Sequence, residues 1–191
     1  MLKLLRERLS GREYELVNPD LPKSAVLVAV TDVFADPEVL LTRRAGHLSR
    51  NPGEVCFPGG KWEEHDESLL VTALRESHEE VGLAPEMVEV IGRLKPLVAR
   101  TGLNVMPYVG IIDANLHLQP TSDELDSVFK VPLQYFMDQR NVTPFLYKFN
   151  DTELSFPSFV YEGYTIWGLT AYIIVDMINS VYDAAIELPF K

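Results

Sequence analysis

The sequence predicts an α/β (α+β) protein in which helices cover a central mixed β-sheet. Three observations lead to this fold class. Several short runs of β-branched and apolar residues are separated by turn residues, and a few longer stretches between them have helical periodicity. A chain of 191 residues suits one domain with a sizeable core. No segment repeats at a fixed period, which argues against solenoids and propellers.

The first third of the chain predicts one short helix and two strands. In residues 2–9 charges interrupt the leucines every few positions, which favours an amphipathic helix over a secretory signal. Residues 24–31 form a β-branched apolar run typical of a buried strand, and residues 38–42 are its expected partner across an Asp-Pro turn. Residues 43–60 contain four glycines and two prolines and are expected to form a loop.

The clearest helix is predicted over residues 66–81. Asp66 or Ser68 can serve as its N-cap, and Gly82 stands where a left-handed residue ends a helix. The rest of the chain predicts strands, a hairpin and two further helices. The strands are expected at 88–94, 105–112 and 127–131, the short helix at 132–136, the hairpin at 145–149 and 154–161, and a largely buried helix at 169–182.

Composition and charge exclude several classes of function. The net charge of −11 argues against a non-specific nucleic-acid binder, which needs a basic surface. This charge is uneven, because residues 1–61 are close to neutral and the carboxylates concentrate after them. Cys56 is the only cysteine, so an internal disulfide and a four-cysteine zinc site are excluded. The longest apolar runs fall far short of the roughly 20 residues that a membrane span needs.

Three carboxylates of the predicted helix share one face. Glu76, Glu79 and Glu80 stand at positions i, i+3 and i+4, where like charges destabilise a helix by about 0.2–0.5 kcal/mol per pair. Arg75 is four residues from Glu79 and offsets part of this repulsion. A hard divalent cation such as Mg²⁺ or Mn²⁺ would offset more of it, since carboxylate oxygens are its preferred ligands. The alternative is a solvated acidic face.

A glycine turn and a basic cluster stand ahead of that helix. Residues 57–61 read FPGGK, and two adjacent glycines let a backbone approach a ligand closely. Guanidinium groups bind phosphate through paired donors, so a phosphate site is one interpretation of the basic cluster and a strand-end surface pair is the other. The cluster consists of Arg43, Arg44, His47, Arg50 and Lys61, of which His47 is the least expected to bind a ligand.

At this point the motifs resemble a known family. Gly60 and residues 75–83 resemble the Nudix box, Gly-x5-Glu-x7-Arg-Glu-U-x-Glu-Glu-x-Gly-U, where U is bulky and aliphatic. Ser77 departs from the pattern at a U position. The upstream spacing has one extra residue, so Asp66 and Glu67 both stay open as the first acidic position. The resemblance implies a Nudix-type α/β/α sandwich with a central mixed β-sheet.

The upstream segment resembles one branch of that family, the coenzyme A diphosphatases, which include peroxisomal enzymes. Residues 40–45, Gly53 and residues 57–60 are similar to the signature of this branch. An arginine is expected where this chain has Ser49, and Arg50 stands beside that position. Further similar segments are 107–110, 123–133 and 167–170. The domains expected from the resemblance are an N-terminal helical extension at 1–23, a Nudix hydrolase domain at 24–182 and a C-terminal tail at 183–191.

The branch implies a metal-dependent hydrolase with a small-molecule substrate. It would cleave the pyrophosphate bond of coenzyme A and acyl-CoA esters, giving 3′,5′-ADP and (acyl-)4′-phosphopantetheine. The expected metal ligands, for Mg²⁺ or Mn²⁺, are Glu76, Glu79 and Glu80. The expected catalytic residues are Glu79, Glu80, Arg75 and Glu124. The residues expected to bind substrate are Arg43, Arg44, Arg50, Gly59, Gly60 and Lys61.

Several alternatives stay open. The general base is a glutamate of the box or Glu124, and Glu124 is otherwise a plain loop carboxylate. Trp167 and Tyr172 are more typical of a core than of an adenine-binding platform. The substrate could instead be ADP-ribose, a dinucleotide or a nucleoside triphosphate, or the protein could be a non-catalytic nucleotide-binding module. A peroxisomal location is expected by resemblance and a cytoplasmic one is the alternative, because the chain ends LPFK and not in a Ser-Lys-Leu-type signal.

Overall fold

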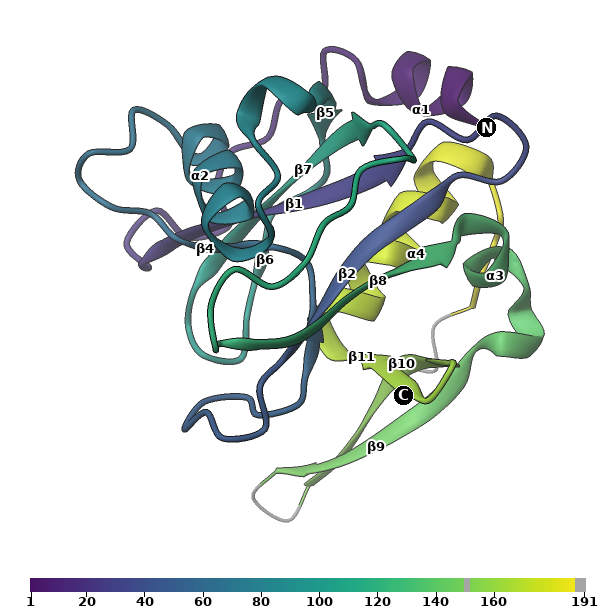
Figure 1. Ribbon diagram of the computed structural model, residues 1–191. Coiled ribbons are helices and arrows are strands. Elements are labelled where there is room, and N and C mark those ends of the chain that lie inside the picture. The colour runs from purple at the N-terminus through teal and green to yellow at the C-terminus, as the bar shows by residue number, and fades with distance from the viewer. Residues whose placement is uncertain (150–151, 188–191) are drawn as a thin grey trace.

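A mixed eight-stranded sheet forms the centre of the protein (Figure 1). The computed structural model describes residues 1–149 and 152–187. The main path of the sheet runs β3-β2-β1-β7-β5, with β4 beside β1, β6 beside β7 and β8 beside β2. The strands are β1 (Lys23–Thr31), β2 (Glu38–Arg44), β3 (Val55–Cys56), β4 (Gly59–Lys61), β5 (Glu89–Arg93), β6 (Leu97–Val98), β7 (Asn104–Ile112) and β8 (Leu125–Pro132). Strands β1 and β7 are parallel and the other pairs are antiparallel, which confirms the predicted mixed sheet.

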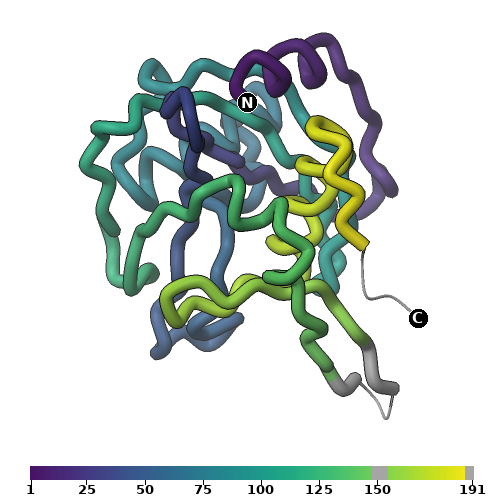
Figure 2. The backbone as a smooth tube through the Cα atoms, turned by 90° about the vertical axis from the view of Figure 1, so that its right-hand side faces the viewer, coloured from purple at the N-terminus to yellow at the C-terminus, as the bar shows by residue number. Residues whose placement is uncertain are grey.

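Helices cover both faces of this sheet (Figures 1 and 2). Successive side chains of β1 point to opposite faces, so Val28 packs in one core and Leu27 in the other. The core around Val28 contains residues of α1 and α4, and the core around Leu27 contains residues of α2. The helices are α1 (Leu2–Leu9), α2 (Leu69–Val81), α3 (Leu133–Met137) and α4 (Gly168–Tyr182), with the short 3₁₀ turns η1 (Pro85–Met87) and η2 (Gln139–Asn141). The predicted α/β/α sandwich is confirmed.

A second, three-stranded antiparallel sheet extends from the body of the protein (Figure 2). It consists of β9 (Thr143–Phe149), β10 (Thr152–Tyr161) and β11 (Tyr164–Trp167), and β11 leads directly into α4. The two strands of the predicted hairpin are present. Its expected turn at Asn150 and Asp151, and the C-terminal residues 188–191, lie outside the described residues.

Several local boundaries differ from the sequence prediction. Helix α2 begins at Leu69 because Ser68 is its N-cap, accepting a hydrogen bond from the backbone N–H of Val71. Gly82 ends it in the left-handed conformation, at φ 72°, as predicted. The segment 43–60, expected to be loop throughout, contains β3 and the start of β4. Strand β8 continues to Pro132, so α3 begins one residue later than expected.

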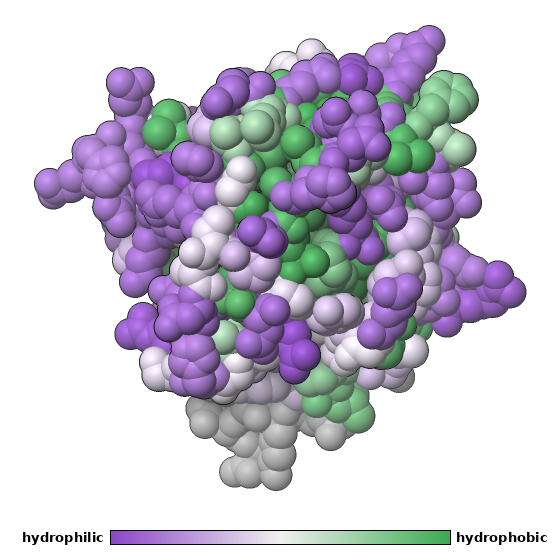
Figure 3. Space-filling model, viewed as in Figure 1, coloured by the Kyte–Doolittle hydropathy of each residue, from purple (hydrophilic) through white to green (hydrophobic). Residues whose placement is uncertain are grey.

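The N-terminal helix is part of the main core. Leu5 and Leu9 are fully buried, and α1 packs against α4 and β5. The face of the molecule in Figure 3 is mostly hydrophilic, with hydrophobic side chains visible between the polar ones. Within the described part of the chain, no helix is both long and apolar enough to cross a membrane.

Candidate active site

A buried ion pair anchors the acidic helix. The side chain of Asp66 is fully buried in the loop before α2, and its carboxylate accepts hydrogen bonds from Nε and Nη2 of Arg75 at 2.9 and 3.0 Å. The hydroxyl of Thr72 and the backbone N–H of Glu63 also donate to it. Arg75 therefore holds the pKa of Asp66 well below its usual range. Glu67, the other candidate for this position, is exposed.

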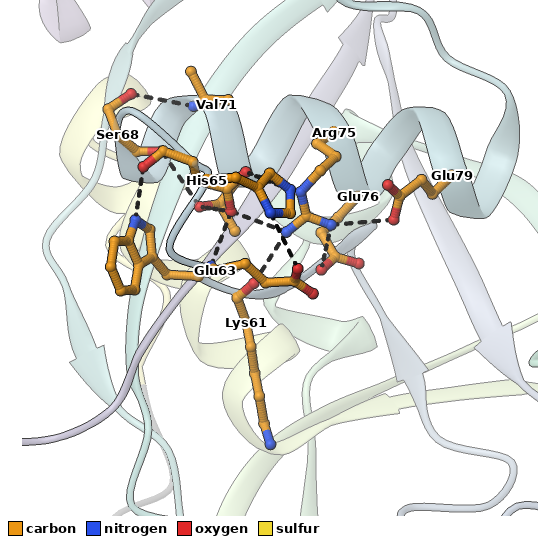
Figure 4. A network of polar contacts seen from close by, with 11 residues as sticks. Lys61, Glu63, His65, Ser68, Val71, Arg75, Glu76 and Glu79 are labelled. Atoms are coloured by element: carbon orange, nitrogen blue, oxygen red, sulfur yellow. Dashed lines mark hydrogen bonds and ion pairs between the residues drawn. The ribbon is translucent and has the colours of Figure 1, made fainter.

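The same arginine also binds two carboxylates of its own helix (Figure 4). Its Nη1 donates to Oε1 of Glu76 and to Oε2 of Glu79, each at 3.1 Å, and its Nη2 donates to the carbonyl oxygen of Lys61 at 3.1 Å. With the two bonds to Asp66, the five N–H groups of this guanidinium are all used. Arg75 thus fixes the helix carboxylates and has no donor left for a substrate.

Glu80 lies deeper than the other carboxylates of the face. Its Oε2 accepts a hydrogen bond from the backbone N–H of Gly59 at 3.0 Å, which ties α2 to the glycine turn. The pKa of Glu80 is raised to about 7, mainly by burial and in part by the nearby Glu76 and Glu124, against the opposing effects of the Gly59 hydrogen bond and Arg44. Glu124, in the exposed loop before β8, is therefore within electrostatic reach of Glu80.

The two glycines of the turn are required for different reasons. Gly59 has φ 153°, and a Cβ there would lie 2.4 Å from the carbonyl oxygen of Ala25 on β1. A Cβ on Gly60 would instead lie 2.3 Å from Cδ and Oε1 of Glu76. Gly59 is needed for the close approach of two backbones, whereas Gly60 leaves room for a carboxylate.

The carboxylates are the kind of ligand that a hard divalent cation prefers, but their side chains do not converge on one point. Glu76, Glu79 and Glu80 offer oxygen ligands on one helix face, and burial raises the pKa of Glu76 as well as that of Glu80. Among the described residues, however, no three His, Cys, Asp or Glu side chains converge as a metal site. Arg75 holds Glu76 and Glu79, and Gly59 holds Glu80. A metal would have to displace some of these hydrogen bonds.

The structure brings one of the predicted basic residues to the acids. Arg44 at the end of β2 is close enough to Glu80 to lower the pKa of that carboxyl, and its buried Nε has no hydrogen-bond partner in the described part of the chain. Arg43 and Arg50 are exposed and make no ion pair with the helix carboxylates that the structure describes. Lys61 is exposed, and its side chain points away from the Arg75 network in Figure 4.

A pocket of about 470 Å³ adjoins this site, and we call it the aromatic pocket. Arg44 and Cys56 line it and both interact electrostatically with Glu80, so the pocket and the acidic face are neighbours. Burial raises the pKa of the Cys56 thiol to about 11, which makes it unreactive. The other lining residues are Asn51, Glu54, Val55, Leu97, Val98, Ala99, Arg100, Thr101, Tyr147, Phe156, Trp167, Gly168, Leu169, Thr170 and Tyr172.

The sequence did not indicate most of this pocket. Neither Glu54 nor Arg100 belongs to a recognisable motif, and nearly fifty residues separate them along the chain. Trp167, expected to be core, is half-buried, stacks on Phe145 and also lines the pocket. The only available signal was the similarity of residues 167–170 to the coenzyme A diphosphatase branch.

Comparisons with known proteins agree with this fold. Residues 21–149 match the NUDIX domain family model. The chain is 42% identical over 176 residues to an uncharacterized Nudix hydrolase, NudL, of Citrobacter koseri, covering 92% of this chain and 88% of that protein. It is 40% identical over 141 residues to NudL of Enterobacter sp. strain 638, covering 74% and 73%.

Solved structures show the same fold at low sequence identity. A MutT/nudix family protein from Enterococcus faecalis superimposes with a TM-score of 0.57 and 19% identity, covering 95% of this chain and 68% of that one. RenU, a Nudix hydrolase from M. smegmatis, has a TM-score of 0.50 and 21% identity, covering 60% and 72%. With the family match over most of the chain and the site described above, this protein belongs to the Nudix hydrolases, a family of enzymes that hydrolyse pyrophosphate-containing substrates.

Proposed function

We propose that the protein hydrolyses the pyrophosphate bond of coenzyme A and its acyl esters, releasing 3′,5′-ADP and (acyl-)4′-phosphopantetheine. The observation that carries the proposal is the buried, unpartnered Nε of Arg44 between the acidic face and the aromatic pocket. A buried donor without an acceptor is costly, so its retention favours an anionic ligand at this point. The similarity of residues 40–45, Gly53 and residues 57–60 to the coenzyme A diphosphatase branch favours this substrate among pyrophosphates.

Different residues serve substrate binding and the chemical step. When bound, Mg²⁺ or Mn²⁺ would stabilise charge on the phosphoryl oxygens and acidify a water molecule. Arg44 meets charge on the pyrophosphate through its guanidinium donors. Arg75 has no free N–H and acts by positioning Glu76 and Glu79.

Two carboxylates are candidates for the general base. Glu80 lies deepest on the acidic face of α2 and accepts a hydrogen bond from the backbone N–H of Gly59. Glu124 lies in an exposed loop within electrostatic reach of Glu80. Replacing each by glutamine separates them, because loss of the base lowers kcat far more than KM.

Incubation of the protein with Mg²⁺ or Mn²⁺ and coenzyme A, followed by chromatography for 3′,5′-ADP, tests the proposal. Acetyl and longer acyl esters, ADP-ribose, a dinucleotide and a nucleoside triphosphate should be compared in parallel. Turnover of coenzyme A with a higher kcat/KM than any of the other nucleotides supports it. A preference for one of those nucleotides, or no product from coenzyme A, refutes it.

A further inference from the structure

Two arginine side chains stand at the aromatic pocket without an ion-pair partner among the described residues. Arg44 lies at the end nearest Glu80. Arg100 is exposed in the turn after β6, and its guanidinium carbon lies 4.6 Å from the ring centroid of Tyr147. Stacking on Tyr147 orients the guanidinium but leaves its N–H donors free for another ligand. The pocket therefore presents two separate cationic groups.

One carboxylate of the pocket wall lies within electrostatic reach of both arginines but does not contact either of them. Glu54 is half-buried, and both Arg100 and Arg44 act to lower its pKa, although burial has the larger, opposite effect. Neither arginine forms an ion pair or hydrogen bond with Glu54 among the contacts of the described chain. An incoming anion thus has to displace no ion pair at either guanidinium.

The aromatic side chains Tyr147, Phe156 and Trp167 line the same pocket. Trp167 stacks on Phe145 with centroids 4.3 Å apart, and Tyr147 lies nearly parallel to it at 5.9 Å. Phe156 meets Trp167 edge-on. Planar bases bind to such surfaces by stacking, and this interaction tolerates different bases. A ligand with an aromatic ring and two anionic groups matches the pocket.

We propose that the aromatic pocket holds the nucleoside half of the substrate and that Arg100 binds its second phosphate, the ribose 3′-phosphate of coenzyme A. The proposal rests on the proposed function. The other half of coenzyme A, the pantetheine arm, is uncharged and would leave Arg100 without a counter-charge. Arg44, being next to the acidic face, then meets the pyrophosphate. Arg100 is a specificity-determining residue for the 3′-phosphate.

Steady-state kinetics with coenzyme A and 3′-dephospho-coenzyme A test this assignment. Arg100→Gln should raise KM for coenzyme A by about tenfold to a hundredfold, the effect of one charge-assisted hydrogen bond, and leave kcat and the KM for the dephospho substrate unchanged. Arg100→Lys keeps the charge but loses the planar donor group. Its KM for coenzyme A should lie between those of the wild-type protein and Arg100→Gln. Arg140→Gln is the matched control, since Arg140 pairs with Asp138 on the surface. Equal increases for both substrates, or no increase, would overturn the proposal.

A binding measurement separates this proposal from the proposed function. Calorimetry with 3′,5′-ADP and with 5′-AMP, which differ only in the 3′-phosphate, does not require turnover. The wild-type protein should bind the nucleotide with the 3′-phosphate about tenfold to a hundredfold more tightly than the one without it. Arg100→Gln should bind the two nucleotides equally. If coenzyme A is not hydrolysed but this preference is found, only the proposed function fails. If the wild-type protein binds both nucleotides equally, the pocket assignment is wrong.

Discussion

Replacing Gly60 with alanine is expected to displace the Glu76 carboxylate and leave the fold intact. The new Cβ would stand 2.3 Å from Cδ and Oε1 of Glu76 and 2.6 Å from Oε2. Carbon atoms in ordinary contact are separated by roughly 3.5 Å or more, so the carboxylate has to retreat by about 1 Å. The clash involves the end of a flexible side chain, and Gly60 has no left-handed backbone, so the free energy of unfolding should change by about 1 kcal/mol or less.

The effect on catalysis should be much larger than the effect on stability. A misplacement of about 1 Å in a catalytic constellation can lower the rate by on the order of a hundredfold. Gly60→Ala should therefore reduce kcat for the proposed substrate, coenzyme A, by about that factor at saturating Mg²⁺. It should also weaken Mg²⁺ binding, which calorimetric titration measures directly. Thermal and urea unfolding of the same preparations report the stability.

Gly59→Ala is the matched control for this prediction. Its Cβ would meet the backbone of β1, 2.4 Å from the Ala25 carbonyl oxygen and 2.6 Å from Cα of Val26, at a φ that favours glycine. A strand backbone cannot retreat as a side chain can, so Gly59→Ala should unfold at a clearly lower temperature. Near-normal kcat and Mg²⁺ affinity in Gly60→Ala would refute the reasoning. Loss of stability equal to that of Gly59→Ala would refute it as well.

Three further predictions concern the carboxylates. Asp66→Asn should lower the free energy of unfolding by about 3 kcal/mol in urea titrations, because it leaves Arg75 without its buried partner, whereas Glu67→Gln should change it by less than about 0.5 kcal/mol. Glu79→Gln should reduce turnover by at least about a hundredfold with little change in melting temperature, and unchanged turnover would reject its catalytic and metal roles. In the metal-free protein the pKa of Glu80 is about 7 in the folded state, against 4.5 for an ordinary glutamate. Between these two pH values the folded state keeps a proton that the unfolded state has lost. Stability should fall by on the order of 3 kcal/mol between pH 4.5 and 7 relative to Glu80→Gln, and parallel pH profiles of the two proteins would contradict this.

Most of the fold could be predicted because each element has a strong local signal. The β-branched run at 24–31 and the capped helix ending at Gly82 both formed where expected. The short strands β3 and β4 could not be foreseen, since two or three residues carry no periodicity. They exist because β2 and β1 offer partners for them, which is a tertiary effect.

Helical geometry predicts only part of the arrangement of the site. The shared face of the α2 carboxylates follows from their spacing alone. The choice of Asp66 over Glu67 depends on how a loop folds back on Arg75, and no spacing rule gives that. Arg43 and Arg44 are adjacent in one strand and point to opposite faces, and only the packing of that strand in the sheet shows that Arg44 is the one near the acids. Arg100 comes from a turn remote in sequence, so only the fold brings it to the pocket.

Because every N–H donor of Arg75 is bound to the protein, the positive charge that binds a polyanionic substrate has to come from other groups. Arg75 is the only Lys or Arg between residues 63 and 80, and its guanidinium is fully committed to protein acceptors. The negative charge of a pyrophosphate therefore has to be met from outside α2. Arg44 at the end of β2 supplies a buried donor without a partner in the described part of the chain, and the carboxylates offer ligands for a cation. The net charge of −11 thus excludes a broad basic surface without excluding a phosphate-bearing ligand held at one point.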